Sequence, residues 1–191
     1  MVKQLFKSQA AWHAWLEKNH EDPEGVWLHF GKKGSGVATI TYDEALETAL
    51  CFGWIDGQLR PHDEKTFVRK FTPRRARSIW SKVNRAKAER LIKSGHMKPA
   101  GLSAIERARE GGQWDGAYDS ARTATVPPEF QAALDKNKPA AAFFTKLDGA
   151  NRYAVLWRIQ TARNATVRAT RIADIVKMLA KKETFHPKAS K

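Results

Sequence analysis

WIDGQLRPHDEKTFVRKFTP, residues 54–73, is the stretch that decides the fold of the N-terminal half. Trp54–Leu59 and Thr66–Phe71 have the composition of strands, and the turn residues at 61–63 lie between them. The segment GVWLHFGKK, residues 25–33, alternates apolar and polar side chains and supplies a third strand. Together these segments predict a small antiparallel sheet.

Two helices are predicted to accompany this sheet. Ser8 has the character of an N-cap and precedes a run of tryptophans at helical spacing. Thr41 and Glu44 form a capping box at the start of a second helix, for which Gly53 is the expected stop.

Beyond Pro73 the chain becomes almost wholly helical. Asn84 is the predicted cap of a helix whose apolar positions are Ala88, Leu91 and Ile92. Pro99 takes the first position of the following helix, whose apolar positions are Leu102, Ile105 and Ala108. Further helices are expected over 128–135, 139–147, 151–162 and, under an Asn164 cap, 165–181. The predicted fold class is therefore α+β, with a small N-terminal antiparallel sheet and helices followed by a mainly helical C-terminal region. The expected divisions are an N-terminal α/β region over 1–112, a linker or surface loop over 113–128, and a C-terminal helical region over 129–191.

Positive charge is concentrated in two blocks of the 191-residue chain, whose net charge is +14. Residues 60–98 hold thirteen basic and three acidic residues, and residues 152–191 hold ten and two. Clustered cations repel each other, and a phosphate-bearing or other anionic partner would offset that repulsion. We therefore expect two interacting faces.

The composition also limits the class of protein. A single cysteine, Cys51, excludes an intrachain disulfide and a cysteine-based zinc site. The N-terminus lacks a long apolar run, and no stretch is long enough to span a membrane. We expect a cytoplasmic protein.

The strongest candidate site is the arginine-rich loop FTPRRARSIWSKVN, residues 71–84. Guanidinium groups fit phosphate or carboxylate in a bidentate manner, and helix starts add backbone N–H donors. The predicted anion-binding residues are Arg74, Arg75, Arg77, Ser78, Trp80, Ser81 and Asn84. Alternatively, some of these arginines pair with nearby carboxylates and only hold the fold together.

A pocket beside this loop is the second candidate, with Trp54, Asp56 and Arg69 as its residues. Asp56 would act as a base or would orient an arginine, although Asp-Gly is also an ordinary turn pair. Cys51, near a helix C-terminus, is expected to be a buried structural thiol.

Arg163, Arg168 and Arg171 mark a possible second basic surface, for which a solvated helix face is the alternative. The histidines do not have metal-ligand spacing, and no nucleotide-binding or hydrolase motif is present. We expect no metal and no cofactor.

The runs ALCFGWIDGQ (49–58), FTPRRARSIWSKVN (71–84) and AERLIKSGHMKPAGLSAIERAREGGQWDGAYDS (88–120), with the closing arginine-rich helices, closely resemble the YdeI/OmpD-associated, or bacteriocin-protection, family. The similarity covers nearly the whole chain. The resemblance implies a role in tolerance of antimicrobial peptides or of stress, and it supplies no catalytic residues. Any protection is expected to act indirectly, inside the cell.

Three functions remain open at this stage. The first is binding of nucleic acid or another phosphate-rich polymer through the arginine-rich loop. The second is an enzyme or receptor for a small phosphorylated or carboxylated metabolite that uses the same loop and Asp56. The third is an adaptor that docks an acidic protein. The sequence leaves the oligomeric state undetermined.

Overall fold

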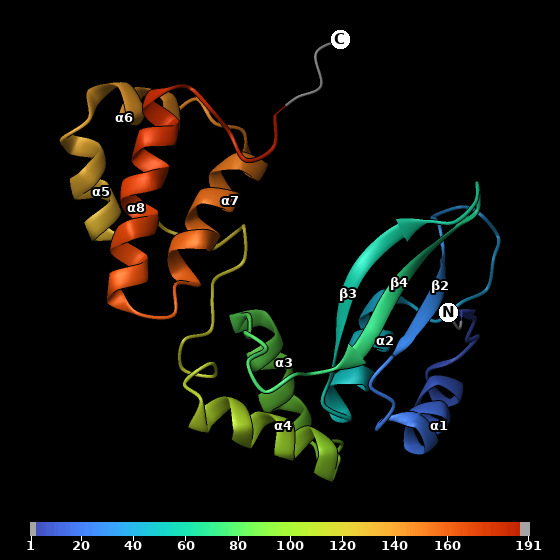
Figure 1. Cartoon of the computed structure of the whole chain (residues 1–191). Coiled ribbons are helices and arrows are strands. Elements are labelled where there is room, and N and C mark those ends of the chain that lie inside the picture. Colours follow the sequence, from blue (N-terminus) through green and yellow to red (C-terminus); the bar gives the residue numbers. More distant parts are fainter. Residues whose placement is uncertain (1–2, 188–191) are drawn as a thin grey trace. The chain divides into compact units, whose positions relative to one another are not determined.

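The computed structural model describes residues 3–187, which form eight helices and four strands (Figure 1). The chain divides into two compact units, Met1–Trp80 with Asn84–Asp115, and Ser81–Val83 with Gly116–Lys191. The first unit contains β1 (Lys3–Gln4), α1 (Gln9–Asn19), β2 (Val26–Gly31), α2 (Tyr42–Cys51), β3 (Trp54–Pro61), β4 (Thr66–Pro73), most of α3 (Lys82–Lys93) and α4 (Pro99–Glu110).

The sheet of the first unit has the order β1-β2-β4-β3. β4 pairs antiparallel with both β2 and β3, which confirms the three predicted strands. β1 adds a fourth strand that runs parallel to β2. A two-residue strand is too short to show an alternating pattern, so no feature of the sequence marks it.

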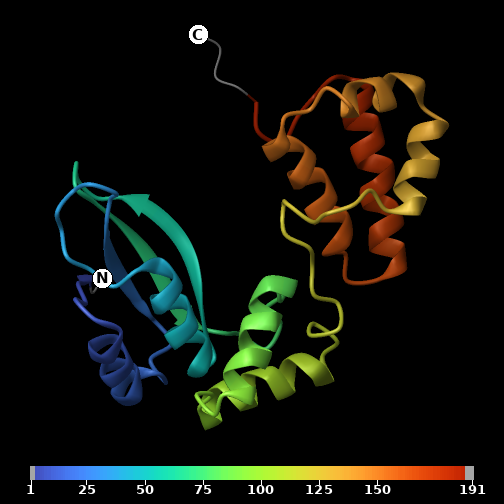
Figure 2. The same ribbon diagram turned by 180° about the vertical axis from the view of Figure 1, so that it is seen from behind.

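Strand alternation gives this sheet two different faces. Leu28 lies opposite Arg69 on the face toward α2, because Arg69 contacts Tyr42 of that helix. The neighbouring pair, Trp27 and Lys70, therefore points to the other face. Figures 1 and 2 show α1 and α2 together on one side of the sheet. We call the side that bears Trp27 and Lys70 the open face.

Aromatic side chains form the core between α1, α2 and the sheet. The Trp12 ring lies 6.2 Å from that of Trp54 and 5.9 Å from that of Phe71, edge to face in both cases. Both indole N–H groups are satisfied, since Trp12 donates to the Ala45 carbonyl and Trp54 to the His20 carbonyl. Buried tryptophans with paired N–H groups are strongly stabilising.

Local signals determine the helix ends in this unit. The Ser8 cap and the Thr41–Glu44 capping box are both formed. Gly53 follows α2 with φ +73°, and a Cβ there would come within 2.8 Å of the Ala100 carbonyl oxygen. Only glycine suits a position with both constraints.

Three predictions for α3 and α4 were wrong. Asn84 lies inside α3, which begins two residues earlier at Lys82, where the backbone N–H donates to the Tyr118 carbonyl oxygen. Ile92 and Leu102 are exposed at 36% and 46%. The other apolar positions of the two helices, Ala88, Leu91, Ile105 and Ala108, are buried as expected, and Ala104 is buried with them.

The second unit is helical and contains α5 (Pro128–Asp135), α6 (Lys138–Phe144), α7 (Gly149–Gln160) and α8 (Ala165–Ala180). All four predicted helices are present, and Asn164 caps α8 as expected. Large apolar side chains from every helix build one core: Phe130, Leu134, Phe144, Val155, Leu156, Ile159, Ile172, Ile175 and Leu179. None of the helices in residues 3–187 is both long enough and apolar enough to cross a bilayer.

Candidate functional site

Arg74, the first arginine of the predicted loop, belongs to the core of the first unit. Its guanidinium carbon lies 3.5 Å from the centroid of the Trp80 ring, and its Nη1 donates to the Ile79 carbonyl oxygen at 3.2 Å. The side chain is only 7% exposed. Arg74 therefore supports the turn after β4, and its guanidinium group is not exposed for contact with a ligand.

The two tryptophans predicted at the ligand site are also core residues. Trp80 is 2% exposed, with Arg74 on its ring and Trp114 4.9 Å away, so it has no face available for a base. Trp54 is fully buried against the helices of the first unit. Their assignment as a stacking platform and a pocket wall is corrected by this burial.

The rest of the loop differs in exposure. Ser78 closes a turn, since its Oγ accepts from the Arg75 N–H at 2.9 Å while its own N–H donates to the Arg75 carbonyl. Arg75 and Arg77 are exposed. Ser81 pairs with Tyr118 in an isolated bridge of the second unit, so the loop does not gather all of its predicted residues at one point.

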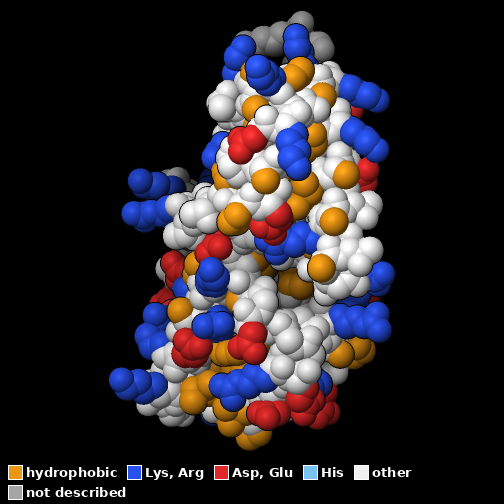
Figure 3. Space-filling view, turned by 90° about the vertical axis from the view of Figure 1, so that its left-hand side faces the viewer, with side chains coloured by type: hydrophobic (Ala, Val, Ile, Leu, Met, Phe, Trp, Pro, Cys, Tyr) orange, Lys and Arg blue, Asp and Glu red, His pale blue; other side chains and the backbone are white. Residues whose placement is uncertain are grey.

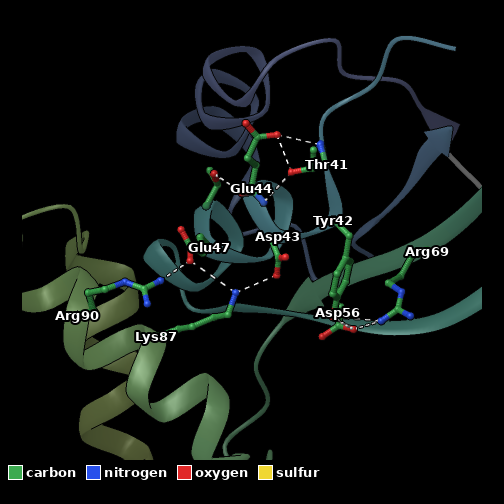
Figure 4. Close-up of polar contacts among 10 residues, drawn as sticks. Thr41, Tyr42, Asp43, Glu44, Glu47, Asp56, Arg69, Lys87 and Arg90 are labelled. Atoms are coloured by element: carbon green, nitrogen blue, oxygen red, sulfur yellow. Dashed lines mark hydrogen bonds and ion pairs between the residues drawn. The ribbon is translucent and has the colours of Figure 1, made fainter. Parts of the chain in front are cut away.

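Basic side chains of α3 are used within the fold. Lys87 Nζ lies 3.0 Å from Asp43 Oδ1 and 3.5 Å from Glu47 Oε1, and Arg90 also pairs with Glu47 (Figure 4). These contacts fasten α3 to α2. Arg85 pairs along the helix with Glu89, and Lys82 pairs with Asp119 of the second unit. Ion pairs within the protein therefore account for these cations of α3, which lie outside the set of loop arginines for which such pairing was the alternative.

Asp56 and Arg69 lie together, and the protein itself satisfies their charges. The Asp56 carboxylate accepts from the Tyr42 hydroxyl at 2.9 Å and forms an ion pair with Arg69 (Figure 4). The Arg69 guanidinium also stacks on the Tyr42 ring. Burial, followed by the Asp56 charge, raises the pKa of Tyr42 well above its usual range. The sequence did not indicate Tyr42, which belongs to a different element from Asp56.

The open face of the sheet carries basic side chains. The Arg60 guanidinium lies 4.7 Å from the Trp27 ring centroid, and the ring of His29 lies 4.5 Å from that of His62. Burial lowers the pKa of His29, the charges of His62 and Lys3 lower it further, and the charge of Asp63 opposes them.

The three arginines of the predicted second surface point in different directions. Arg168 pairs with Glu129 of α5, whereas Arg171 donates to the Arg158 carbonyl oxygen at the end of α7. Arg163 is exposed between these helices. The structure therefore does not gather them into one patch.

A cavity of about 520 Å³ in the first unit lies between α1, α2 and the turn after α3. Its lining includes His13, Glu47, Cys51, His96 and Lys98. Burial raises the pKa of the Cys51 thiol to about 11, so this sulfur is a neutral thiol near pH 7 and a poor nucleophile. This agrees with the expected structural role.

The charges of this cavity are balanced internally. Glu47 is paired with α3, and Glu17 lies 3.6 Å from His13 and 3.8 Å from Lys98. Within residues 3–187, no group of three or more metal-ligating side chains is placed to hold an ion. The cavity therefore shows no arrangement for nucleophilic or metal chemistry.

Two family models match different parts of the chain, and the gap between them includes the boundary between the two structural units. Residues 4–104 match the model described as "Domain of unknown function (DUF8412)", and residues 123–182 match the model described as "Bacteriocin-protection, YdeI or OmpD-Associated". No curated protein and no solved structure matches the chain. The resemblance noted in the sequence is confirmed over 123–182, where the closing arginine-rich helices lie. Its runs at 49–58 and 71–84, and the run 88–120 as far as residue 104, lie in the part that matches the other model. The chain therefore belongs to the DUF8412 family, whose model covers more than half of it, and its residues 123–182 match the model of the YdeI/OmpD-associated, bacteriocin-protection family.

Proposed function

We propose that this protein binds phosphate-bearing polymers, such as nucleic acid, through the cations that its first unit leaves unpaired. One contrast carries the proposal. Four cations of α3, Lys82, Arg85, Lys87 and Arg90, are held by carboxylates, whereas Arg60, Lys70, Arg75 and Arg77 have no carboxylate within ion-pair distance in the described part of the chain. Folding therefore neutralises part of the basic block and leaves these four side chains for a partner.

The chemistry of these residues favours contact with the phosphate backbone over reading of bases. Arginine and lysine bind phosphate oxygens regardless of sequence. The aromatic side chains nearest to them, Trp27 and Trp80, are both 2% exposed and provide no stacking surface. Binding without sequence preference is the expected behaviour.

The cellular role follows from the same property. Binding of nucleic acid implies a cytoplasmic location, and the bacteriocin-protection family of residues 123–182 suggests a part in stress tolerance. A surface that attracts anions repels cationic peptides, so protection would act indirectly. A metabolite site at Asp56 is less favoured, because Tyr42 and Arg69 already occupy that carboxylate.

Fluorescence anisotropy with a labelled oligonucleotide, at 50 and 200 mM salt, tests the proposal. We expect tight binding that weakens steeply with salt, and an Arg75→Ala/Arg77→Ala variant whose salt slope is shallower by about 0.7 for each phosphate that it no longer neutralises. An Arg122→Ala/Lys146→Ala variant is the matched control, since both of its residues are exposed, both lie in the second unit, and the change in net charge is equal. Equal weakening in both variants, or no binding at 50 mM salt, would exclude the proposed surface.

A further inference from the structure

An apolar groove runs along the second unit between α5 and α8. It has a volume of about 760 Å³. Its floor and walls are mostly small or branched apolar side chains: Ala133, Ala165, Ala169, Ile172, Ala173 and Val176. Figure 3 shows hydrophobic side chains between Lys and Arg on the side of the molecule where α5 lies in Figure 1.

α8 carries more apolar surface than its own core uses. Ile172, Ile175 and Leu179 are buried in the core of the unit. Ala165, Ala169 and Ala173 follow at intervals of four residues along the groove, and all three are exposed. A helix whose apolar surface extends beyond its packed face has a second face suited to a partner.

The two ends of the groove differ in charge. At one end Glu129 of α5 pairs with Arg168 of α8, which places the N-terminal halves of these helices together. Lys136 and Lys177 follow seven and nine residues later and line the same groove. At a rise of about 1.5 Å per residue, they lie roughly 10–13 Å from the ion pair. Neither lysine has a carboxylate within ion-pair distance in residues 3–187.

We propose that this groove docks an amphipathic helix that carries Asp or Glu beside its apolar face. The length between the ion pair and the lysines corresponds to about two helical turns, which suits anchors at i, i+4 and i+7. One alanine per turn on α8 allows the backbone of the guest helix to approach closely. Lys136 and Lys177 supply the charge complementarity that selects an acidic guest over a cationic one.

The surface is distinct from the one proposed for nucleic acid. It lies in the second unit and its floor presents methyl groups in place of hydrogen-bond donors. Phosphate polymers would gain little from such a floor, whereas the apolar face of a helix would be removed from water. Failure of either proposal therefore leaves the other standing.

A designed peptide tests the inference on the full chain. The probe is a fluorescein-labelled 18-residue helix with Leu at i, i+4 and i+7 and with Glu on both flanks. We expect saturable binding in fluorescence anisotropy, with amide shifts in NMR spectra at α5 and α8. A scrambled peptide of the same composition should bind at least tenfold more weakly.

Matched variants distinguish binding in the groove from nonspecific attraction between the charges of the peptide and of the protein. Ala169→Arg fills the floor, and Ala142→Arg places the same side chain on an exposed position of α6, outside the groove. We expect binding to weaken at least tenfold in the first variant only. A Lys136→Glu/Lys177→Glu variant should no longer bind the Glu-flanked peptide and should bind a Lys-flanked version, whereas Lys146→Glu should change neither.

Three results would overturn the inference. One is equal binding of the ordered and scrambled peptides. Another is equal weakening in the groove variants and their controls, each verified as folded by circular dichroism. The third is binding only to anionic lipid vesicles or to oligonucleotide, with no response to the peptide.

Discussion

The central carbon of the Arg74 guanidinium lies over the Trp80 ring, 3.5 Å from the ring centroid, and both side chains are almost completely buried. This contact makes Arg74 chemically different from Arg75 and Arg77, although all three belong to one basic run. Mutation of Arg74 should therefore affect stability, whereas mutation of Arg75 or Arg77 should affect ligand binding.

Arg74→Ala should lower the free energy of unfolding by about 2–3 kcal/mol, because it removes a desolvated cation–π contact and a buried hydrogen bond. Arg74→Lys should recover little of this stability, since a lysine keeps the charge but lacks the planar guanidinium group that stacks on the ring. Arg75→Ala and Arg77→Ala should each change stability by less than about 0.5 kcal/mol. Urea denaturation of the four variants provides the comparison, and full rescue by lysine would contradict the stacking argument.

Asp56→Asn should destabilise the first unit by about 2 kcal/mol, because it leaves the half-buried Arg69 without its carboxylate. The cost stays below that of a fully buried pair, since both side chains keep some contact with water. Tyr42→Phe should cost about 1 kcal/mol for its single hydrogen bond. A double-mutant cycle measures the coupling, with the exposed Asp115→Asn as control, and strictly additive effects would disprove the cluster.

His29 should make stability depend on pH on the acidic side of neutrality. Its pKa in the folded protein is lowered by burial, His62 and Lys3, with a smaller opposing effect of Asp63. Between the lowered pKa and about 6.5, the unfolded chain binds more protons than the folded protein does. The free energy of unfolding should therefore increase as the pH is raised through this window and decrease as the pH is lowered through it.

Proton NMR titration of the imidazole and denaturation between pH 5 and 7.5 measure both effects. His29→Gln should flatten the pH dependence. A phosphate polymer bound to the open face should raise the pKa of His29, because the anion favours the protonated ring. An unchanged titration in the presence of saturating oligonucleotide would place the polymer elsewhere.

Cys51 should react slowly with iodoacetamide in the folded protein. With a thiol pKa of about 11, only about one molecule in 10⁴ carries a thiolate at pH 7. Labelling should accelerate strongly in urea, where the thiol is exposed and regains an ordinary pKa. Mass spectrometry of timed samples measures both rates without ambiguity, because the chain has a single cysteine. Equal rates in the two states would refute a buried neutral thiol.

Local sequence signals predicted the fold well. The Thr41–Glu44 box, Pro99 at the start of α4 and the Asn164 cap act over three or four residues, so their outcome could be read from the chain directly. The helices of the second unit follow from the same kind of signal. The predicted cap at Asn84 was wrong, because α3 begins at Lys82, whose backbone N–H donates to the Tyr118 carbonyl oxygen.

The candidate site was less accessible to sequence reasoning. Density of charge is visible in a sequence, but the partner of each charge is not. Lys87 meets Asp43 across 44 positions, and Tyr42 meets Asp56 across 14. Arg74 and Arg75 are adjacent residues of the same type, and only the direction of each side chain after β4 decides that one is buried and the other exposed.

The strand order has a consequence for how the chain reaches its fold. β4 is the last strand to be synthesised, yet it is the one that joins β2 to β3. The β3–β4 hairpin is local and can form early, whereas β2 must wait for partner residues 35–45 positions further along. Until then the edge of β2 is unpaired in the nascent chain, and such an edge is prone to aggregation. A pause in translation before residue 66 should therefore harm the yield of folded protein more than a pause after residue 73.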